Sequence, residues 1–360
     1  MKTWNIGIIG YAHSHIHSNA LDFYNLGGRV RFGAGADVRP LVEPTNRGAR
    51  TRYGVMQATN AAIGLTKLYD DYHEMLERES FDIILCCSEN AFHADVCEAV
   101  LGRGIHVVVE KPLAITMEQA ARIARAARAG GAEVFVNWPS TWRNPVREAE
   151  RLVAAGAIGP LYKMTYRNRD SLGPLSYGQV MTPEEMGQEW WYQQAAGGGA
   201  LLDYCCYGAN LSRWFFGTAP EACYAVAANF NSPFGDTEDY ATITARYPGG
   251  IAIIEGSWVT VNTGIPYGPI LYGRDATLVV DDSEIRIYRT RHAPEPDEVI
   301  EVGPLPAGRS TLGEEVLYHL ETGEPIHPTL ELGLNLEAQM VLDAGIRSLA
   351  SGRLEATRRG

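Results

Sequence analysis

The chain lacks the long apolar runs that a membrane-spanning helix requires. No uninterrupted apolar stretch among its 360 residues approaches the roughly 20 residues that cross a bilayer. Residues 1–4 lead directly into a strand-like run, without the apolar core and small-residue cleavage site of a signal peptide. We therefore expect a cytoplasmic protein without a membrane partner.

Positive charge is also scarce. The chain has 31 Lys and Arg residues against 43 Asp and Glu residues, which gives a formal net charge of −12. Proteins that bind the phosphate backbone of nucleic acids, or an anionic membrane surface, need an excess of Lys and Arg. This balance argues against nucleic-acid and membrane partners.

Cysteine is too sparse for a disulfide framework. The chain contains six cysteines and no C-x-x-C pair. Their neighbours are mostly apolar, so we expect buried, reduced thiols. These cysteines are Cys86, Cys87, Cys97, Cys205, Cys206 and Cys223.

Apolar residues are plentiful, and their pattern changes along the chain. The first third alternates short apolar runs with helical patterns, which predicts βαβ units and a doubly wound parallel sheet. Its expected strands are residues 6–9, 31–36, 82–87, 105–109 and 133–136, and a capping box at Thr116 and an N-cap at Asn90 are expected to open two of its helices.

The second part has consecutive strand-like runs separated by turns, which is typical of an antiparallel sheet. The runs are residues 161–167, 222–229, 240–247, 251–260, 277–280 and 284–288, followed by a closing helix over 330–349. We therefore predict an α/β fold with a Rossmann domain over residues 1–135. A substrate-binding α+β domain over residues 136–360 would follow, with its C-terminal helix packing back.

The turn after the first strand is a candidate dinucleotide site. A pyrophosphate needs a tight turn, close backbone approach and a helix N-terminus. Gly10 supplies the turn, but Ala12 and His15 replace the second and third glycines of the usual fingerprint. The motif is therefore degenerate, and alone it fits a turn in another α/β protein equally well. The candidate cofactor residues are Gly10, Tyr11, Ala12, His13, Ser14 and His15.

Asp37 ends the second expected strand, 27 positions after Gly10. A carboxylate at this place accepts hydrogen bonds from the adenosine ribose and repels a 2′-phosphate. This favours NAD as the cofactor, although the nearby Arg39 leaves NADP open. The alternative is a solvated loop acid.

His13, His15 and His17 raise the alternative of a metal site, as in metal-dependent hydrolases built on a (β/α)₈ barrel. That barrel needs parallel strands throughout, whereas the second half here has an antiparallel pattern. Alternate positions on a helix also point in different directions. We therefore expect no bound metal.

A candidate chemical centre comes from two distant segments. Glu110 and Lys111 directly follow a predicted parallel strand, and ligands bind at the carboxyl ends of such strands. Asp203 and Tyr207 follow three glycines at 197–199 and lie four residues apart, so they share one helical face. Together they can form a proton-transfer unit. Taken singly, they could be a surface lysine, a helix acid and a core tyrosine.

These blocks resemble the Gfo/Idh/MocA oxidoreductases. The resemblance rests on the glycine turn, on residues 88–93 (SENAFH) leading to the Glu110-Lys111-Pro112 block, and on the glycine block leading to Asp203 and Tyr207. Their order and spacing fit over nearly the whole chain. The resemblance implies an NAD(P)-dependent enzyme with an open-faced antiparallel sheet, which commonly forms homodimers or homotetramers.

The resemblance also implies residue roles. Lys111 would be catalytic and its bond to Pro112 cis, with Asp203 beside it. Tyr207 stands where many members carry a histidine acid/base. The cofactor-lining residues that it implies are Ser88, Asn90, His93, Glu110, Lys111 and Asn137.

Two departures from the family pattern concern tryptophans. Trp142 stands where an arginine is usual, three residues before Pro145, and the Trp-Arg pair that often precedes the glycines is absent. Further tryptophans and polar residues are candidates for sugar contacts, with core packing or a solvated loop as the alternative. These substrate candidates are Trp138, Arg167, Asp170, Trp190 and Trp191.

The sequence thus predicts an NAD(P)-dependent dehydrogenase. It would transfer a hydride between nicotinamide and a secondary hydroxyl of a carbohydrate, polyol or glycoside substrate. Two alternatives stay open, namely an NAD-dependent glycoside hydrolase of the same family and a non-catalytic dinucleotide-binding sensor.

Overall fold

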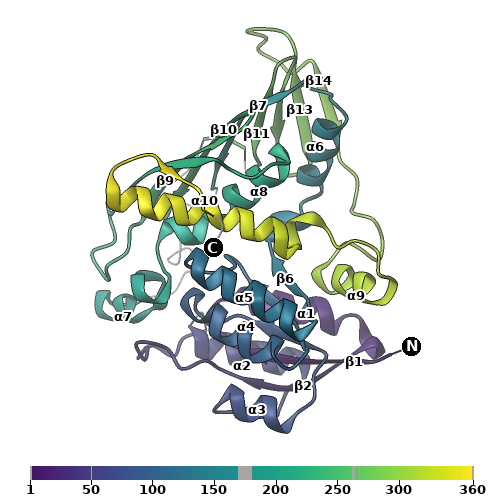
Figure 1. Cartoon of the computed structure of the whole chain (residues 1–360), viewed down its shortest axis with the longest axis vertical. Coiled ribbons are helices and arrows are strands. Elements are labelled where there is room, and N and C mark those ends of the chain that lie inside the picture. Colours follow the sequence, from purple (N-terminus) through teal and green to yellow (C-terminus); the bar gives the residue numbers. More distant parts are fainter. Residues whose placement is uncertain (1, 50, 169–180, 262–263, 267, 359–360) are drawn as a thin grey trace.

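The computed structural model describes residues 2–49, 51–168, 181–261, 264–266 and 268–358. Figure 1 shows two sheets, with the N-terminal one at the bottom of the view and the larger, green one at the top. Helix α10 (Leu332–Ser351) crosses between them.

The first sheet is entirely parallel, and its strand order is β3-β2-β1-β4-β5-β6. This order confirms the predicted doubly wound fold. The strands are β1 (Trp4–Ile9), β2 (Val30–Ala36), β3 (Leu68–Tyr69), β4 (Ile83–Cys86), β5 (His106–Glu110) and β6 (Val134–Asn137). The helices between them are α1 (His15–Tyr24), α2 (Arg52–Ile63), α3 (Tyr72–Arg78), α4 (His93–Leu101) and α5 (Met117–Gly130).

The chain reverses its direction of strand addition between β1 and β4, which are neighbours in this sheet. Ligands of open parallel sheets bind at such a switch point, outside the carboxyl ends of the strands. The turn after β1 and the loop after β4 therefore meet where a cofactor is expected. The end of β5, which carries Glu110, lies on the same edge.

The second sheet has the order β14-β13-β12-β11-β7-β10-β9-β8-β15. Its neighbouring strands are antiparallel except β7 and β10, so the antiparallel prediction is confirmed for most of the sheet. The strands are β7 (Leu161–Arg167), β8 (Ala222–Ala228), β9 (Tyr240–Tyr247), β10 (Gly250–Ser257), β11 (Ile270–Gly273), β12 (Thr277–Val280), β13 (Glu284–Tyr288), β14 (Glu298–Glu301) and β15 (Glu355–Ala356).

Helices cover one face of this sheet and leave the other open. Along β9, Ala241, Ile243 and Ala245 are buried, whereas Thr244 and Arg246 between and beyond them are exposed. This period of two is the mark of a sheet with one packed face. The remaining helices are α6 (Asn144–Ala154), α7 (Pro183–Gln188), α8 (Cys206–Phe216) and α9 (Leu312–Thr322).

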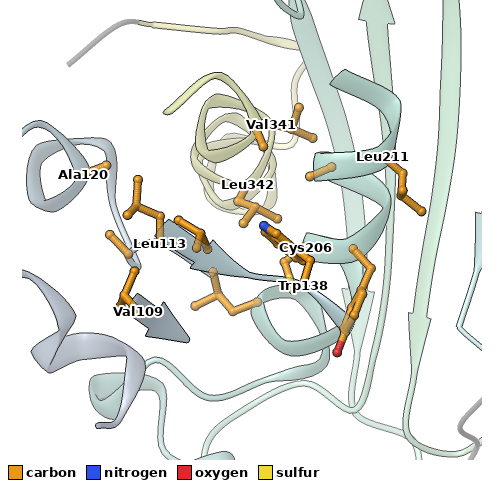
Figure 2. Packing of buried hydrophobic residues seen from close by; sticks show 14 of the residues in the cluster. Val109, Leu113, Ala120, Trp138, Cys206, Leu211, Val341 and Leu342 are labelled. Atoms are coloured by element: carbon orange, nitrogen blue, oxygen red, sulfur yellow. The ribbon is translucent and has the colours of Figure 1, made fainter. Parts of the chain in front are cut away.

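Helix α10 joins the two parts into one core, because it contacts α8 and β8 as well as α5. Figure 2 shows its side chains Val341 and Leu342 between Leu113, from the loop after β5, and Leu211 of α8. All four side chains are buried in one hydrophobic cluster. The C-terminal helix α10 thus packs against elements of both parts of the chain.

Several local predictions need correction. Asn90 is not the N-cap of α4, because that helix is preceded by Phe92 and the Asn90 amide donates to the Gly197 carbonyl at 2.8 Å. Thr116 does cap α5, but the Gln119 side chain accepts from Ile115 rather than closing a capping box. The six cysteines are free and buried, as predicted.

Gly130 gives a test of how tightly α5 packs on α4. A Cβ added there would lie 1.8 Å from the carbonyl oxygen of Leu101, which belongs to α4 and has little freedom to move. We expect Gly130→Ala to lower the free energy of unfolding by roughly 2–4 kcal/mol, because the backbone must shift. Urea unfolding measures this change.

Gly249→Ala is the matched control. Gly249 has no heavy atom within 4 Å of an added Cβ and does not have a positive φ. The control should change stability by less than about 0.5 kcal/mol. Equal effects of the two substitutions would contradict the packing argument.

Candidate active site

The turn after β1 is tied to the ends of both neighbouring strands. The Gly10 amide donates to the Ala36 carbonyl at 2.9 Å, and the Ala12 amide donates to the Cys87 carbonyl at 2.9 Å. Gly10 has φ +91°, and a Cβ there would lie 2.4 Å from the backbone nitrogen of Ser88. The turn therefore needs glycine, and it places the N-terminus of α1 at the switch point. These features fit a bound pyrophosphate.

Asp37 lies directly beside this turn. Its Oδ1 accepts hydrogen bonds from the backbone amides of Tyr11 at 3.0 Å and Val38 at 2.9 Å. Arg52 binds the same carboxylate through Nε and Nη2, at 2.9 and 3.0 Å. The side chain is still 22% exposed, so it can accept from a ribose hydroxyl. Arg39 is exposed.

The three histidines of α1 and its turn have separate partners. His13 Nδ1 accepts from the His15 amide at 3.0 Å, His15 Nδ1 lies 3.0 Å from Glu110 Oε1, and His17 Nδ1 lies 3.5 Å from Thr59 Oγ1. Within the described ranges, no group of three or more His, Cys, Asp or Glu residues could hold a metal ion. Burial lowers the pKa of His13 well below its usual value, and the nearby His15 and Lys111 act in the same direction, so this ring is neutral.

Lys111 and Asp203 form a buried ion pair between the two parts of the chain. Lys111 Nζ donates to Asp203 Oδ1 at 2.6 Å and to the Asp203 carbonyl at 2.9 Å. Burial alone would lower the pKa of Lys111, but Asp203 and Glu110 raise it above its usual value, so the ammonium stays charged. The Lys111–Pro112 peptide bond is cis, as the resemblance implies.

Asp203 lies in a short π-helical segment, Leu201–Cys205, that leads into α8. Its second oxygen, Oδ2, accepts a hydrogen bond from the Trp258 indole at 3.2 Å. Trp258 follows β10 and is only 3% exposed. Both carboxylate oxygens therefore have fixed donors.

Tyr207 completes the predicted trio on the next turn. Lys111 Nζ lies 4.9 Å from the centroid of its ring, and the edge of Trp138 packs against the same ring with centroids 5.6 Å apart. Tyr207 is 7% exposed. The structure thus brings Lys111, Asp203 and Tyr207 together, with the ammonium over the face of the phenol ring.

A chain of hydrogen bonds supports this trio from the side of the first sheet. Glu110, which is bound to His15, accepts from Asn19 at 3.4 Å. Asn137 at the end of β6 donates to Asn19 at 2.9 Å and accepts from the Trp142 indole at 3.2 Å. Trp142, the departure from the family pattern, therefore holds a predicted cofactor residue in place.

The loop after β4 is fixed to both segments that carry the predicted catalytic residues. Asn90 binds the Gly197 carbonyl, and His93 Nδ1 lies 2.9 Å from the Pro112 carbonyl. Ser88 is buried and its hydroxyl donates to the Glu89 carbonyl at 3.2 Å. The structure therefore gathers Ser88, Asn90 and His93 between the dinucleotide turn and Lys111.

The predicted substrate residues do not form one surface. Trp138 is 2% exposed, and its indole donates to Asn335 at 2.8 Å, so it backs Tyr207 from the core and cannot stack on a sugar in this conformation. Arg167 pairs with Glu255 at 2.5 Å. This pair lies on the open face of the second sheet, opposite the face that α8 covers. Asp170 falls outside the described residues.

Trp190 and Trp191 lie against the dinucleotide turn. The Trp190 indole donates to the Ala12 carbonyl at 2.9 Å, and the Trp191 ring packs edge-on against His13 with centroids 4.7 Å apart. The two indoles also stack on each other, with their ring centroids 3.9 Å apart. They connect the second part of the chain to the turn after β1.

Three residues in or beside the site have no signal in the sequence analysis. Trp258, Arg52 and Glu189 carry no motif, because the residues with which they interact are distant along the chain. Asp203 lies 55 positions from Trp258, Asp37 lies 15 positions from Arg52, and Arg52 lies 137 positions from Glu189. Arg52 is only 4% exposed, which is unusual for an arginine.

Comparison with known proteins agrees with this geometry. Residues 5–138 match the family model described as an oxidoreductase family with an NAD-binding Rossmann fold, and residues 146–279 match the GFO/IDH/MocA C-terminal domain. The chain belongs to the Gfo/Idh/MocA family. Its predicted family and its NAD-binding fold are therefore confirmed.

Curated relatives are distant. D-glucoside 3-dehydrogenase of Escherichia coli is 29% identical over 136 residues, which are 38% of each chain. Myo-inositol 2-dehydrogenase of Thermotoga maritima is 23% identical over 231 residues, which are 63% of this chain and 61% of the relative. The chain thus spans less than two thirds of the length of these relatives in either alignment.

Solved structures share the fold over the whole length. The WlbA dehydrogenase from Bordetella pertussis, in complex with NADH and UDP-GlcNAcA, has a TM-score of 0.76 at 19% identity and 99% coverage of both chains. Aldose-aldose oxidoreductase from Caulobacter crescentus, complexed with glycerol, has a TM-score of 0.75 at 20% identity, covering 99% of this chain and 100% of that one. No helix among the described residues is long and apolar enough to cross a membrane.

Glu189 gives a pH-dependent test of the contact between the second part of the chain and this site. It is 7% exposed, and its buried Oε1 has no hydrogen-bond partner. Burial raises the pKa of Glu189 to about 7, although Arg52 acts in the opposite direction. When folding raises the pKa of a carboxyl group, the group increasingly destabilises the folded protein as the pH rises from the pKa of the unfolded state to the pKa of the folded state.

We therefore expect Glu189→Gln to stabilise the protein above about pH 7 and to have little effect near pH 4.5. The gain should be on the order of 2–3 kcal/mol, measured by urea unfolding at several pH values. Glu184→Gln, at an exposed position of the preceding helix α7, is the control and should show no such trend. A Glu189→Gln gain that is the same at all pH values would refute the burial argument.

Proposed function

We propose that the protein is an NAD-dependent dehydrogenase that oxidises a secondary hydroxyl of a sugar, polyol or glycoside. The observation that carries this proposal is the buried Lys111–Asp203 pair at the carboxyl end of β5, with its ammonium over Tyr207 and the dinucleotide turn beside it. The relatives named above act, by their names, on a glucoside and on myo-inositol.

The chain's own residues fit NAD. The Gly10 turn leaves no room for a side chain, α1 begins beside it, and Asp37 has a partly exposed carboxylate at the end of β2. When bound, NAD accepts a hydride from the substrate carbon. The residues of the chain must bind the hydroxyl and remove its proton.

Lys111 is the group that binds the substrate oxygen in this proposal. An ammonium has three N–H donors. Two of them go to Asp203, so the third can donate to the substrate hydroxyl. Asp203 orients the ammonium but is not itself the base, because Lys111 and Trp258 occupy its two oxygens.

Tyr207 takes the hydroxyl proton as the hydride leaves. An ordinary tyrosine, with a pKa of ~10, is a poor base at neutral pH, so a nearby positive charge is needed to favour the phenolate. Lys111 supplies that charge over the ring of Tyr207. The two residues therefore act as one proton-transfer unit.

The direct test is absorbance of reduced nicotinamide after mixing the protein with NAD⁺ or NADP⁺ and a panel of sugars, inositols, anhydrosugars and glycosides. Reduction with one subset supports the dehydrogenase and identifies the substrate class. Release of an aglycone without net NADH would favour the NAD-dependent glycoside hydrolase instead. Tight NAD binding with no turnover would favour the sensor.

Replacing Lys111 tests the mechanism. We expect Lys111→Met to lower turnover by roughly 10²-fold or more, because the proton-transfer unit loses its charge. The single variant also leaves Asp203 buried without its ion partner, which destabilises a fold by about 3–5 kcal/mol. Stability must therefore be separated from chemistry.

The double variant Lys111→Met with Asp203→Asn provides that separation. It removes both charges, so it should recover much of the stability while turnover stays low. Cofactor binding is measured by NADH fluorescence in each variant. Undiminished turnover in Lys111→Met with normal NADH binding would rule out the assigned role.

We infer that a second copy of the chain covers the open face of the second sheet. Four large apolar side chains there are 42–51% exposed, a patch that an oligomer would bury. They are Tyr224, Val226, Ile251 and Ile253.

Free, buried cysteines in addition support a reducing compartment, which is why we place the protein in the cytoplasm.

Ile253→Asp should then shift the protein to monomers in sedimentation velocity, because an unpaired charge is costly in a buried interface. Val299→Asp is the control, since Val299 is 47% exposed on β14 at the far edge of the same sheet. A wild-type protein that is already monomeric, or a control that dissociates equally, would count against this interface.

A further inference from the structure

Arg52 is a buried arginine whose guanidinium nitrogens all have acceptors. It is the first residue of α2 and only 4% exposed. Nε and Nη2 donate to the two oxygens of Asp37, and Nη2 also donates to the Val38 carbonyl at 2.7 Å. Nη1 donates to Glu89 at 2.5 Å. The side chain is thus held from the loops after both β2 and β4.

Carboxylates surround this guanidinium on several sides. Besides Asp37 and Glu89, Glu189 from the second part of the chain lines the same small hollow, together with Trp190. Glu89 Oε2 and Glu189 Oε1 are buried there without hydrogen-bond partners. One guanidinium therefore faces three acidic side chains, and the electrostatic field disfavours a further anion.

The position of Arg52 gives this arrangement a functional meaning. Asp37 is the carboxylate that would accept the ribose hydroxyls, and Arg52 binds that same carboxylate as a fork. A phosphate on the ribose 2′-oxygen would thus arrive within reach of Arg52. Arginine is well suited to bind phosphate through two parallel N–H groups.

We propose that Arg52 determines cofactor choice as a latent 2′-phosphate ligand that Asp37 keeps occupied. Asp37 excludes NADP in two ways, because it repels the phosphate and also withholds the arginine that would bind it. The inference rests on the proposed NAD-dependent function and specifies how its cofactor site selects.

This arrangement separates Arg52 from a purely structural arginine. Removing Asp37 both removes the repulsion and frees the Nε and Nη2 fork, so the gained affinity for NADP should depend on Arg52. If Arg52 were only structural, removing it after Asp37 would leave that affinity unchanged. Removing the charge of Glu89 instead weakens only the contact of Nη1 and leaves the fork on Asp37.

The experiment is a double-mutant cycle that measures NADH and NADPH binding by fluorescence, without substrate. We expect Asp37→Ser to raise NADPH affinity relative to NADH by about 10²-fold or more, given that a charge-assisted bidentate contact replaces a repulsion. Adding Arg52→Gln to Asp37→Ser should remove at least about tenfold of NADPH affinity and change NADH affinity much less. Arg52→Lys in the same background should fall between, because lysine keeps the charge but not the fork.

Glu89→Gln is the control for a general loss of negative charge. It should raise the NADPH-to-NADH affinity ratio much less than Asp37→Ser does, because the Nε and Nη2 fork stays bound to Asp37. Thermal unfolding shows whether each variant is folded. Equal NADPH affinity of folded Asp37→Ser with and without Arg52→Gln would overturn the proposal. A gain in NADPH affinity in Glu89→Gln as large as that in Asp37→Ser would also overturn it.

The outcome is independent of catalysis. If NADPH affinity depends on Asp37 and Arg52 as expected but no substrate is turned over, the role of Arg52 is upheld and the dehydrogenase proposal fails. Normal turnover with NAD⁺, combined with NADPH affinity that does not depend on Arg52, would refute the role of Arg52 and leave the dehydrogenase proposal standing. Absence of binding for both dinucleotides would overturn both.

Discussion

The buried ion pair between Lys111 and Asp203 is the constraint on which the rest of the site depends. One partner follows the last residue of β5 in the parallel sheet, and the other lies in the π-helical segment that leads into α8. A lone charge at either position would be strongly unfavourable, because both side chains are almost inaccessible to water. The two halves of the chain can therefore bury this region only when the two charges meet. The geometry of the candidate site and the packing of the two parts of the chain thus both require this ion pair.

Hydrogen bonds around the pair extend that requirement to the cofactor turn. Asn90 binds the Gly197 carbonyl and Trp190 binds the Ala12 carbonyl, so the glycine block and the turn after β1 are connected across the two parts. Glu110 adds a second buried carboxylate, which is satisfied by His15 and by the Lys111 amide. The Gly197 carbonyl, the Ala12 carbonyl and the Glu110 carboxylate each have a partner from another segment, and such a network favours one arrangement.

What the sequence could and could not predict follows from the range of the interactions. Five of the six strands of the first sheet and most longer strands of the second follow from local apolar periods, whereas the short strands β3 and β11 were not predicted. The glycine turn, Lys111 and Asp203 stand at motif positions. The predicted N-cap role of Asn90 was wrong, because its side-chain amide donates to the Gly197 carbonyl, 107 positions away along the chain. Trp258 and Arg52 were missed for the same reason. Strand β14, with mostly exposed residues at a sheet edge, has no apolar period to reveal it.

In the role proposed for Arg52, the contact that holds two loops together would also select the cofactor. A guanidinium that holds the loops after β2 and β4 together also fixes the rotamer of Asp37, and a fixed carboxylate discriminates better than a mobile one because it cannot turn away from an approaching phosphate. The Tyr11 and Val38 amides add to this fixation from the backbone. Glu189 comes from the second part of the chain and lies in the same cluster, so the proposed cofactor selection and the packing of the two parts would involve the same charged groups. A substitution of one of these charged groups, in either part of the chain, would therefore change the electrostatic field at the expected ribose position.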